Sequence, residues 1–123
     1  MDRTVVIVDD DPNVRQVLSV LLGQASFDIV GEAADGLEAL TLVRDRKPAL
    51  VILDQEMPRM KGDAAARLLR DLSPETKVLA FSNAFGSKPE WADAFVPKES
   101  VADVEIVLEG LLQLSLDAPT AES

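Results

Sequence analysis

Short apolar runs alternate along this chain with longer segments of helical periodicity, and together they predict its secondary structure. Residues 49–53, Ala-Leu-Val-Ile-Leu, form an unbroken apolar run after Pro48. A run of this length and character is typical of a strand that is buried on both faces. Such strands occur mainly in parallel sheets covered by helices on both sides. Four further strands are predicted at residues 4–8, 28–33, 77–82 and 94–97.

Between these strands, apolar residues recur at three- and four-residue spacing and predict helices. Asp11 and Pro12 form an N-cap and first helical position, and Asp35 and Glu38 have capping-box spacing. Ser100 is the expected N-cap of the last helix. The four predicted helices span about residues 12–24, 36–47, 63–72 and 100–114. The residues expected on their inner faces include Val17, Leu37, Leu68 and Leu114.

The stretch from Asn83 to Trp91 has no useful apolar helical period, so a turn is expected there instead of a full helix. The resulting order, β-α-β-α-β-α-β-β-α, predicts an α/β fold with a doubly wound parallel sheet and right-handed crossovers. Residues 1–116 are expected to form one domain, followed by a flexible C-terminal tail at residues 117–123.

Composition narrows the function classes. The net charge of −10 opposes non-specific binding to nucleic acid or anionic lipid. The chain has no cysteine and no histidine, which excludes disulfides, thiolate metal sites and a Ser-His-Asp triad. Its apolar runs are too short to span a bilayer and no signal peptide is recognised, so a cytoplasmic protein without direct nucleic-acid or membrane partners is expected.

Polar residues follow four of the five predicted strands: Asp9-Asp10, Asp54, Ser82 and Lys98. In a parallel sheet the carboxyl ends of the strands share one edge, where open α/β sheets bind ligands. Clustered carboxylates without His or Cys favour a hard cation, Mg²⁺ first and Mn²⁺ or Ca²⁺ second. A carboxylate beside a metal-bound phosphoryl group can act as a nucleophile and form an aspartyl phosphate.

These motifs resemble the receiver domain of two-component response regulators, over about residues 3–114. The matching segments are Val5-Val6-Ile7-Val8-Asp9-Asp10-Asp11-Pro12, Ala34-Asp35-Gly36-Leu37-Glu38-Ala39-Leu40, Asp54-Gln55-Glu56-Met57-Pro58 with Gly62, and Phe95-Val96-Pro97-Lys98. The resemblance implies a flavodoxin-like five-stranded sheet of order 2-1-3-4-5.

The resemblance also implies a role for each residue that matches the motif. Asp54 would be the phosphoacceptor, and Asp9 and Asp10 would hold Mg²⁺ with it. The backbone carbonyl of Glu56 would be a further metal ligand, and Lys98 would pair with the phosphate. After phosphorylation, Ser82 would swing toward the phosphate and Phe95, at the switch position, would turn inward.

A receiver of this kind acts in phosphorelay signalling. The resemblance implies a phosphoryl donor that is a sensor histidine kinase or a histidine phosphotransfer protein. It implies no enzyme activity beyond self-catalysed phosphotransfer and slow autodephosphorylation. The phosphate would switch a protein-interaction surface, and a homodimer is among the assemblies that the family forms.

The chain also departs from the family pattern. Ser82 and Lys98 are only 16 positions apart (98 − 82), so the fourth helix of the family is expected to be shortened or missing. Asn83 stands where a small residue is usual and is expected to crowd the entrance for the phosphate. Glu56 adds an acid near the path of the hydrolytic water. Pro97 precedes Lys98, so the usual Lys-Pro bond is absent.

Other readings follow from these departures. The chain could be the receiver fragment of a DNA-binding transcription regulator, with the residues from Asp117 as a linker. It could also be a phosphorylation-independent interaction module with a vestigial site. A metal-dependent phosphatase is disfavoured because Asp54, followed by Gln55 and Glu56, does not begin an Asp-x-Asp motif. A dinucleotide-binding domain is disfavoured because no Gly-rich turn follows the first strand.

Overall fold

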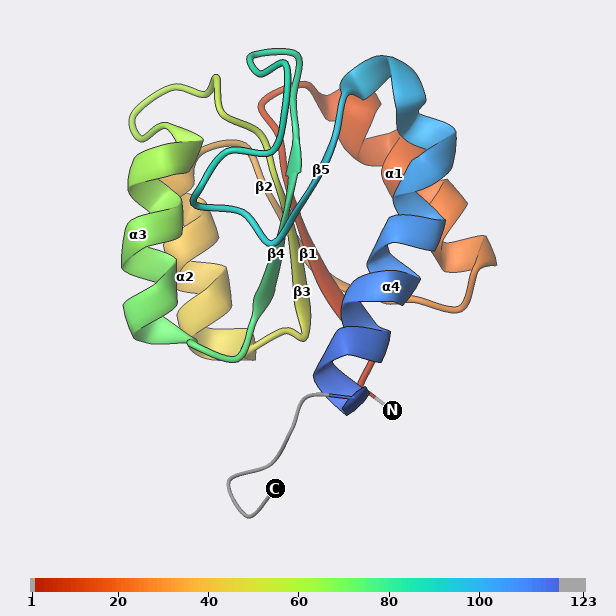
Figure 1. Cartoon of the computed structure of the whole chain (residues 1–123). Helices are drawn as coiled ribbons and strands as arrows, with labels where there is room; N and C mark the ends of the chain where they lie inside the picture. The colour runs from red at the N-terminus through yellow and green to blue at the C-terminus, as the bar shows by residue number, and fades with distance from the viewer. Residues whose placement is uncertain (1, 118–123) are drawn as a thin grey trace.

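Five parallel strands form the centre of the protein, whose computed structural model describes residues 2–117 (Figure 1). The sheet has the order β2-β1-β3-β4-β5, so the predicted fold class and strand order are confirmed. The strands are β1 (Thr4–Val8), β2 (Asp28–Ala33), β3 (Leu50–Leu53), β4 (Lys77–Phe81) and β5 (Ala94–Val96). The fully apolar β3 lies in the middle, whereas the more polar β2 and the short β5 form the edges.

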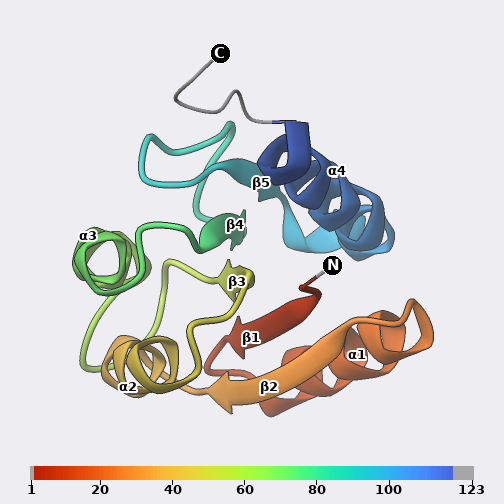
Figure 2. The ribbon, with the colours of Figure 1, turned by 90° about the horizontal axis from the view of Figure 1, so that it is seen from below.

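Helices cover both faces of this sheet (Figure 2). One face carries α1 (Pro12–Gln24) and α4 (Val104–Asp117), and the other carries α2 (Gly36–Arg46) and α3 (Gly62–Leu72). The predicted caps are present: the Asp11 side chain accepts from Asn13 N, and the Asp35 side chain accepts from Glu38 N, both at 2.9 Å. None of the helices within residues 2–117 has the length and hydrophobicity needed to cross a bilayer.

The last helix begins later than predicted. A 3₁₀ helix, η1 (Lys98–Asp103), precedes α4, and Ser100 lies inside it with φ −102° and ψ 33°. The predicted N-cap role of Ser100 is therefore wrong, because the 3₁₀ helix already begins at Lys98 and the Ser100 N–H donates to Pro97 O within it. Asp117, the first residue of the predicted tail, belongs to α4, and residues 118–123 lie outside the described part of the chain.

No helix connects β4 to β5 in the described structure. Residues 82–93, which we call the open segment, form turns and bends on the α2–α3 side of the sheet (teal in Figures 1 and 2). The expectation that the fourth helix of the family is shortened or missing is confirmed. In its place, the ring of Phe85 packs edge-to-face against Trp91 and Phe95, with centroids 5.8 and 6.4 Å apart.

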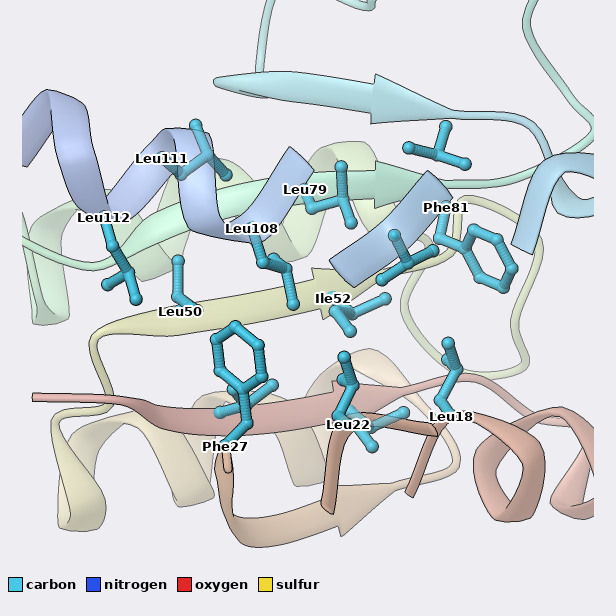
Figure 3. Packing of buried hydrophobic residues seen from close by; sticks show 14 residues of the cluster. Leu18, Leu22, Phe27, Leu50, Ile52, Leu79, Phe81, Leu108, Leu111 and Leu112 are labelled. Carbon is cyan, nitrogen blue, oxygen red and sulfur yellow. The ribbon is translucent and has the colours of Figure 1, made fainter. Parts of the chain in front are cut away.

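The core has two clusters, one on each face of the sheet. Figure 3 shows the cluster under α1 and α4, where Leu18, Leu22 and Leu108 pack onto apolar side chains of the strands. Four residues expected on inner faces are largely exposed instead: Val17 (53%), Leu37 (45%), Leu68 (46%) and Leu114 (62%). Each helix turns only a narrow stripe toward the sheet, and on α2 and α3 that stripe contains the small residues Ala39, Ala65 and Ala66.

Candidate functional site

Three carboxylates meet at the edge of the sheet where the strands have their carboxyl ends. Asp9 and Asp10 follow β1, and Asp54 follows the neighbouring β3. One carboxylate oxygen from each of the three lies within 4.8 Å of the others. Asp9 and Asp54 are buried, whereas Asp10 is exposed. The three strand-end acids that the sequence singles out are therefore brought together.

Lys98 joins the acids from the end of β5. Its Nζ lies 2.8 Å from Asp9 Oδ2 and 2.8 Å from Asp54 Oδ2, and its side chain is 23% exposed. Burial alone would lower the pKa of Lys98, but its bonds to Asp54 and Asp9 outweigh burial and raise the pKa above its usual value. The side chain is therefore an ammonium that bridges two carboxylates.

The negative charge of Asp9 is opposed by burial. Burial raises the pKa of Asp9, and the charge of Asp54 adds to this effect, while the Lys98 ammonium and the Asp11 N–H oppose it. Asp9 Oδ2 is buried and, despite its 2.8 Å distance to Lys98 Nζ, makes no hydrogen bond of good geometry with the described residues. A cation near this oxygen would satisfy it and lower the cost of its charge.

These donors fit a divalent cation. All three side chains offer hard oxygen atoms, which Mg²⁺ prefers, and Mg²⁺ needs only one or two carboxylates beside water and phosphate oxygens. Glu56, whose backbone carbonyl the resemblance adds to the set, lies two residues after Asp54. Its side chain is exposed and pairs with Lys61 at 3.1 Å.

Backbone groups orient the two buried acids. The Asp11 N–H donates to Asp9 Oδ1 at 2.9 Å, and the Gln55 N–H donates to Asp54 Oδ1 at 2.7 Å. Arg15 holds the peptide of Asp9 by donating to its carbonyl at 2.6 Å. In each acid one oxygen is thus fixed by the backbone, and the other, Oδ2, faces Lys98.

The two expected switch residues lie on the β4 and β5 side of the site. Ser82 is buried directly after β4, and its Oγ accepts the Ala84 N–H at 3.1 Å. Phe95 is half-buried in β5 with its ring against Phe85. The side chain of Asn83, expected to crowd the entrance for the phosphate, has Oδ1 bonded to the N–H of Lys98 at 3.1 Å.

The segment that follows Asp54, residues 54–61, is called the acceptor loop here, and sequence reasoning missed most of what holds it. A Cβ on Gly62 would lie 2.2 Å from Asp54 O, so this position needs glycine for close backbone approach. The Gln55 side chain accepts the Asp63 N–H at 2.9 Å and caps α3. A signal existed for Gly62, which stands at the start of a predicted helix where glycine is otherwise unfavourable.

Comparisons with known proteins agree with this geometry. The family model of the response regulator receiver domain matches residues 5–99. A transcriptional regulatory protein, PdtaR of Mycobacterium tuberculosis, is 42% identical over 82 residues, which are 65% of this chain and 40% of PdtaR. The chemotaxis protein CheY of Thermotoga maritima is 33% identical over 82 residues, 67% of this chain and 68% of that protein.

A solved structure supports the same assignment. The response regulator domain of Thermotoga maritima CheB has a TM-score of 0.81 and 27% identity, and the alignment covers 97% of this chain and 100% of that domain. The chain spans about two fifths of the length of the first curated relatives that it matches. On the family match and these likenesses, the chain belongs to the response regulator receiver domain family of two-component systems.

Proposed function

We propose that this chain is a Mg²⁺-dependent phosphoacceptor that receives a phosphoryl group on Asp54 and signals through a change in its surface. The observation that carries the proposal is the position of Lys98 Nζ, 2.8 Å from both Asp54 Oδ2 and Asp9 Oδ2 at the acidic edge of the sheet. An ammonium placed there can stabilise an anionic phosphoryl group that arrives on Asp54.

The chain's own residues would perform the transfer as follows. A carboxylate oxygen of Asp54 attacks the phosphorus of a phosphohistidine, a P–O bond forms, the P–N bond breaks, and the electron pair stays on the imidazole nitrogen. The Gln55 N–H holds the Asp54 carboxylate in place during the attack. The Lys98 ammonium neutralises charge on the phosphoryl oxygens. The Ser82 hydroxyl, which accepts the Ala84 N–H in this structure, would move and donate a hydrogen bond to a phosphoryl oxygen.

Asp9, Asp10 and the backbone carbonyl of Glu56 would hold Mg²⁺ together with Asp54. When bound, the cation supplies Lewis-acid stabilisation of negative charge on the phosphoryl oxygens. Within this chain, Asp9 is the residue that best supports a bound cation, because its buried Oδ2 lacks a hydrogen bond of good geometry.

The donor would be a sensor histidine kinase or a histidine phosphotransfer protein, since receivers interact with such partners. A cavity of about 210 Å³ adjoins the site, and it can take an apolar side chain of the donor. Its walls are formed by Asn13, Val14, Val17, Phe81, Lys98 and Val101. Because Lys98 is shared by the cavity and the acidic site, a partner seated there would bring its phosphohistidine close to Asp54.

Two other functions are supported by particular observations. PdtaR is a transcriptional regulatory protein of which this chain spans 40%, which favours a receiver attached to an output domain. The open segment, which lacks a helix, favours a phosphorylation-independent interaction module. Both readings keep the receiver fold, and only the second dispenses with phosphate chemistry.

Intact mass measured after incubation with acetyl phosphate and Mg²⁺ tests the proposal. We expect the wild-type chain to gain one phosphoryl group, and Asp54→Asn to gain none. Asp71→Asn, which changes an exposed acid on α3, is the matched control and should behave as wild type. A gain by Asp54→Asn equal to that of wild type would refute the role of Asp54. No gain by wild type from acetyl phosphate or from a phosphohistidine protein would favour the phosphorylation-independent module.

A further inference from the structure

The pairing of β4 with β5 is interrupted just before Lys98. The N–H of Ser82 donates to Val96 O at 3.3 Å, and the backbone bond that would follow it in a parallel ladder, from Lys98 N to Ser82 O, is not formed. Lys98 then begins η1, and the first N–H groups of a helix have no partner within the helix. Pro97, at the N-cap position of η1, makes no side-chain capping bond.

Asn83 supplies the missing acceptor from the other strand. Its Oδ1 accepts the Lys98 N–H at 3.1 Å, across 15 positions of sequence. This bond extends the connection between the ends of β4 and β5 by one step beyond the backbone ladder. It fixes the Lys98 backbone at the point from which the side chain reaches Asp9 and Asp54.

We propose that Asn83 is a positioning residue for Lys98, acting through the Lys98 backbone N–H. The role deepens the proposed phosphoacceptor function and rests on it. A lysine side chain has four flexible carbon–carbon bonds, so the place of its ammonium depends on a fixed backbone. If that anchor is lost, Nζ can drift from the Asp54 carboxylate, and misplacement of about 1 Å costs up to ~100-fold in rate.

The bond between Asn83 and the Lys98 N–H also connects Lys98 to the neighbourhood of Ser82. Asn83 follows Ser82 directly, and Ser82 Oγ accepts the Ala84 N–H. The two groups proposed to contact the phosphoryl oxygens, the Ser82 hydroxyl and the Lys98 ammonium, are therefore held by one three-residue stretch. A movement of this stretch on phosphorylation would act on both groups.

The test compares Asn83→Ala, which removes the acceptor, with Asn83→Asp, which keeps an acceptor oxygen of the same reach. Ser87→Ala, an exposed change in the open segment, is the matched control. The initial rate of phosphoryl gain is measured by intact mass at saturating acetyl phosphate with Mg²⁺. We expect Asn83→Ala to be about tenfold slower and Asn83→Asp to recover most of the rate. Ser87→Ala should match wild type.

Hydrogen exchange of the Lys98 amide, followed by NMR, gives a second readout that does not depend on phosphorylation. The amide should exchange faster in Asn83→Ala than in wild type, Asn83→Asp or Ser87→Ala. If Asn83→Ala accepts phosphate at the wild-type rate, or if Asn83→Asp is as slow as Asn83→Ala, the positioning role is overturned while the phosphoacceptor function stands. If wild type itself gains no phosphoryl group from any donor, the proposed function fails and the positioning role fails with it.

Discussion

The acceptor loop and the open segment leave neighbouring strands at the same edge of the sheet, yet they are held in different ways. The acceptor loop is tied by directed bonds: Gly62 N to Gln55 O at 3.0 Å, and Gly36 N to Met60 O at 3.2 Å. The Arg59 guanidinium also pairs with Asp35. The loop is thereby fixed against the N-termini of α2 and α3.

The open segment is bonded to its surroundings near its end, where the Arg70 guanidinium of α3 lies 3.1 Å from both Trp91 O and Asp93 Oδ2. Between its ends it relies mainly on aromatic contacts. Phe85 packs edge-to-face against Trp91 and Phe95, and all three rings are only half-buried. Its polar ties to the site are the two bonds at its start, from Ala84 N to Ser82 Oγ and from Lys98 N to Asn83 Oδ1. The comparison shows two ways of holding a connection: directed bonds run along the acceptor loop, whereas the open segment is bonded at its two ends and packs through aromatic rings between them.

The largest expected difference in stability between the two connections comes from substituting a glycine at each of them. In Gly62→Ala the new Cβ would lie 2.2 Å from Asp54 O and 2.9 Å from Gln55 Cα, so the backbone must shift. We expect a loss of about 3 kcal/mol in the free energy of unfolding, measured by urea denaturation.

Gly86→Ala in the open segment is the control for this change, because a Cβ there meets nothing within 4 Å. Its effect should stay within about 0.5 kcal/mol. If both variants lose the same stability, the contrast between the two connections does not hold.

Low pH should weaken the ion pair of Arg59 with Asp35, which joins the acceptor loop to the start of α2. Burial would raise the pKa of Asp35, but the Glu38 N–H and the Arg59 guanidinium outweigh it, so this pKa lies below its ordinary value. Stability from the Asp35 charge is therefore fully present above the unfolded pKa of about 3.9, and is lost as pH falls through the lower folded pKa.

Asp35→Asn isolates this charge while keeping an acceptor for the cap. Urea denaturation at neutral pH should show a loss of about 1 kcal/mol, because the Arg59 side chain is largely exposed and the pair is screened. The difference from wild type should shrink as the pH falls through the lowered folded pKa of Asp35. A difference that is the same at every pH would mean that the charge of Asp35 does not hold the loop.

An effect of similar size is expected from the aromatic contacts of the open segment. Phe85→Ala removes the edge contacts with Trp91 and Phe95, each worth about 0.5–1.5 kcal/mol when buried. Because the rings are half-exposed, we expect a total loss of about 1 kcal/mol in urea denaturation. Trp91 is the single tryptophan of the chain, so its emission should shift to longer wavelength in the folded variant.

Phe85→Leu, which keeps an apolar side chain, should lose less stability and shift the emission less. Unchanged Trp91 emission in Phe85→Ala would show that the rings do not shield one another, and the open segment would then need another source of order.

The strand ends could be predicted from sequence because the signal is local. Asp9, Asp54 and Lys98 each follow directly on an apolar run, and the parallel topology sends such positions to one edge. The missing helix was also predictable, since the open segment lacks helical periodicity. These expectations depend on neighbouring residues and on one rule of sheet architecture.

Contacts across the chain could not be predicted in this way. The bond between Asn83 and the Lys98 N–H depends on the register of β4 and β5, which the sequence does not specify. The pairing of Arg59 with Asp35 crosses 24 positions and has no sequence pattern. The exposure of Val17 could not be predicted, because the spacing of apolar residues along a helix does not specify how wide a face the sheet covers.

Arg3 bears on the order in which the fold can be completed. Its guanidinium lies 4.1 Å from the centre of the Phe27 ring and pairs with Glu109, a residue 106 positions later. The same late helix contributes Val104, Leu108 and Leu111 to the core cluster over β1, β3 and β4. During synthesis, when the N-terminal part of a chain emerges first, α1 covers only part of this face, and the rest stays exposed until the last helix arrives. Until then the exposed apolar surface of the nascent sheet favours aggregation.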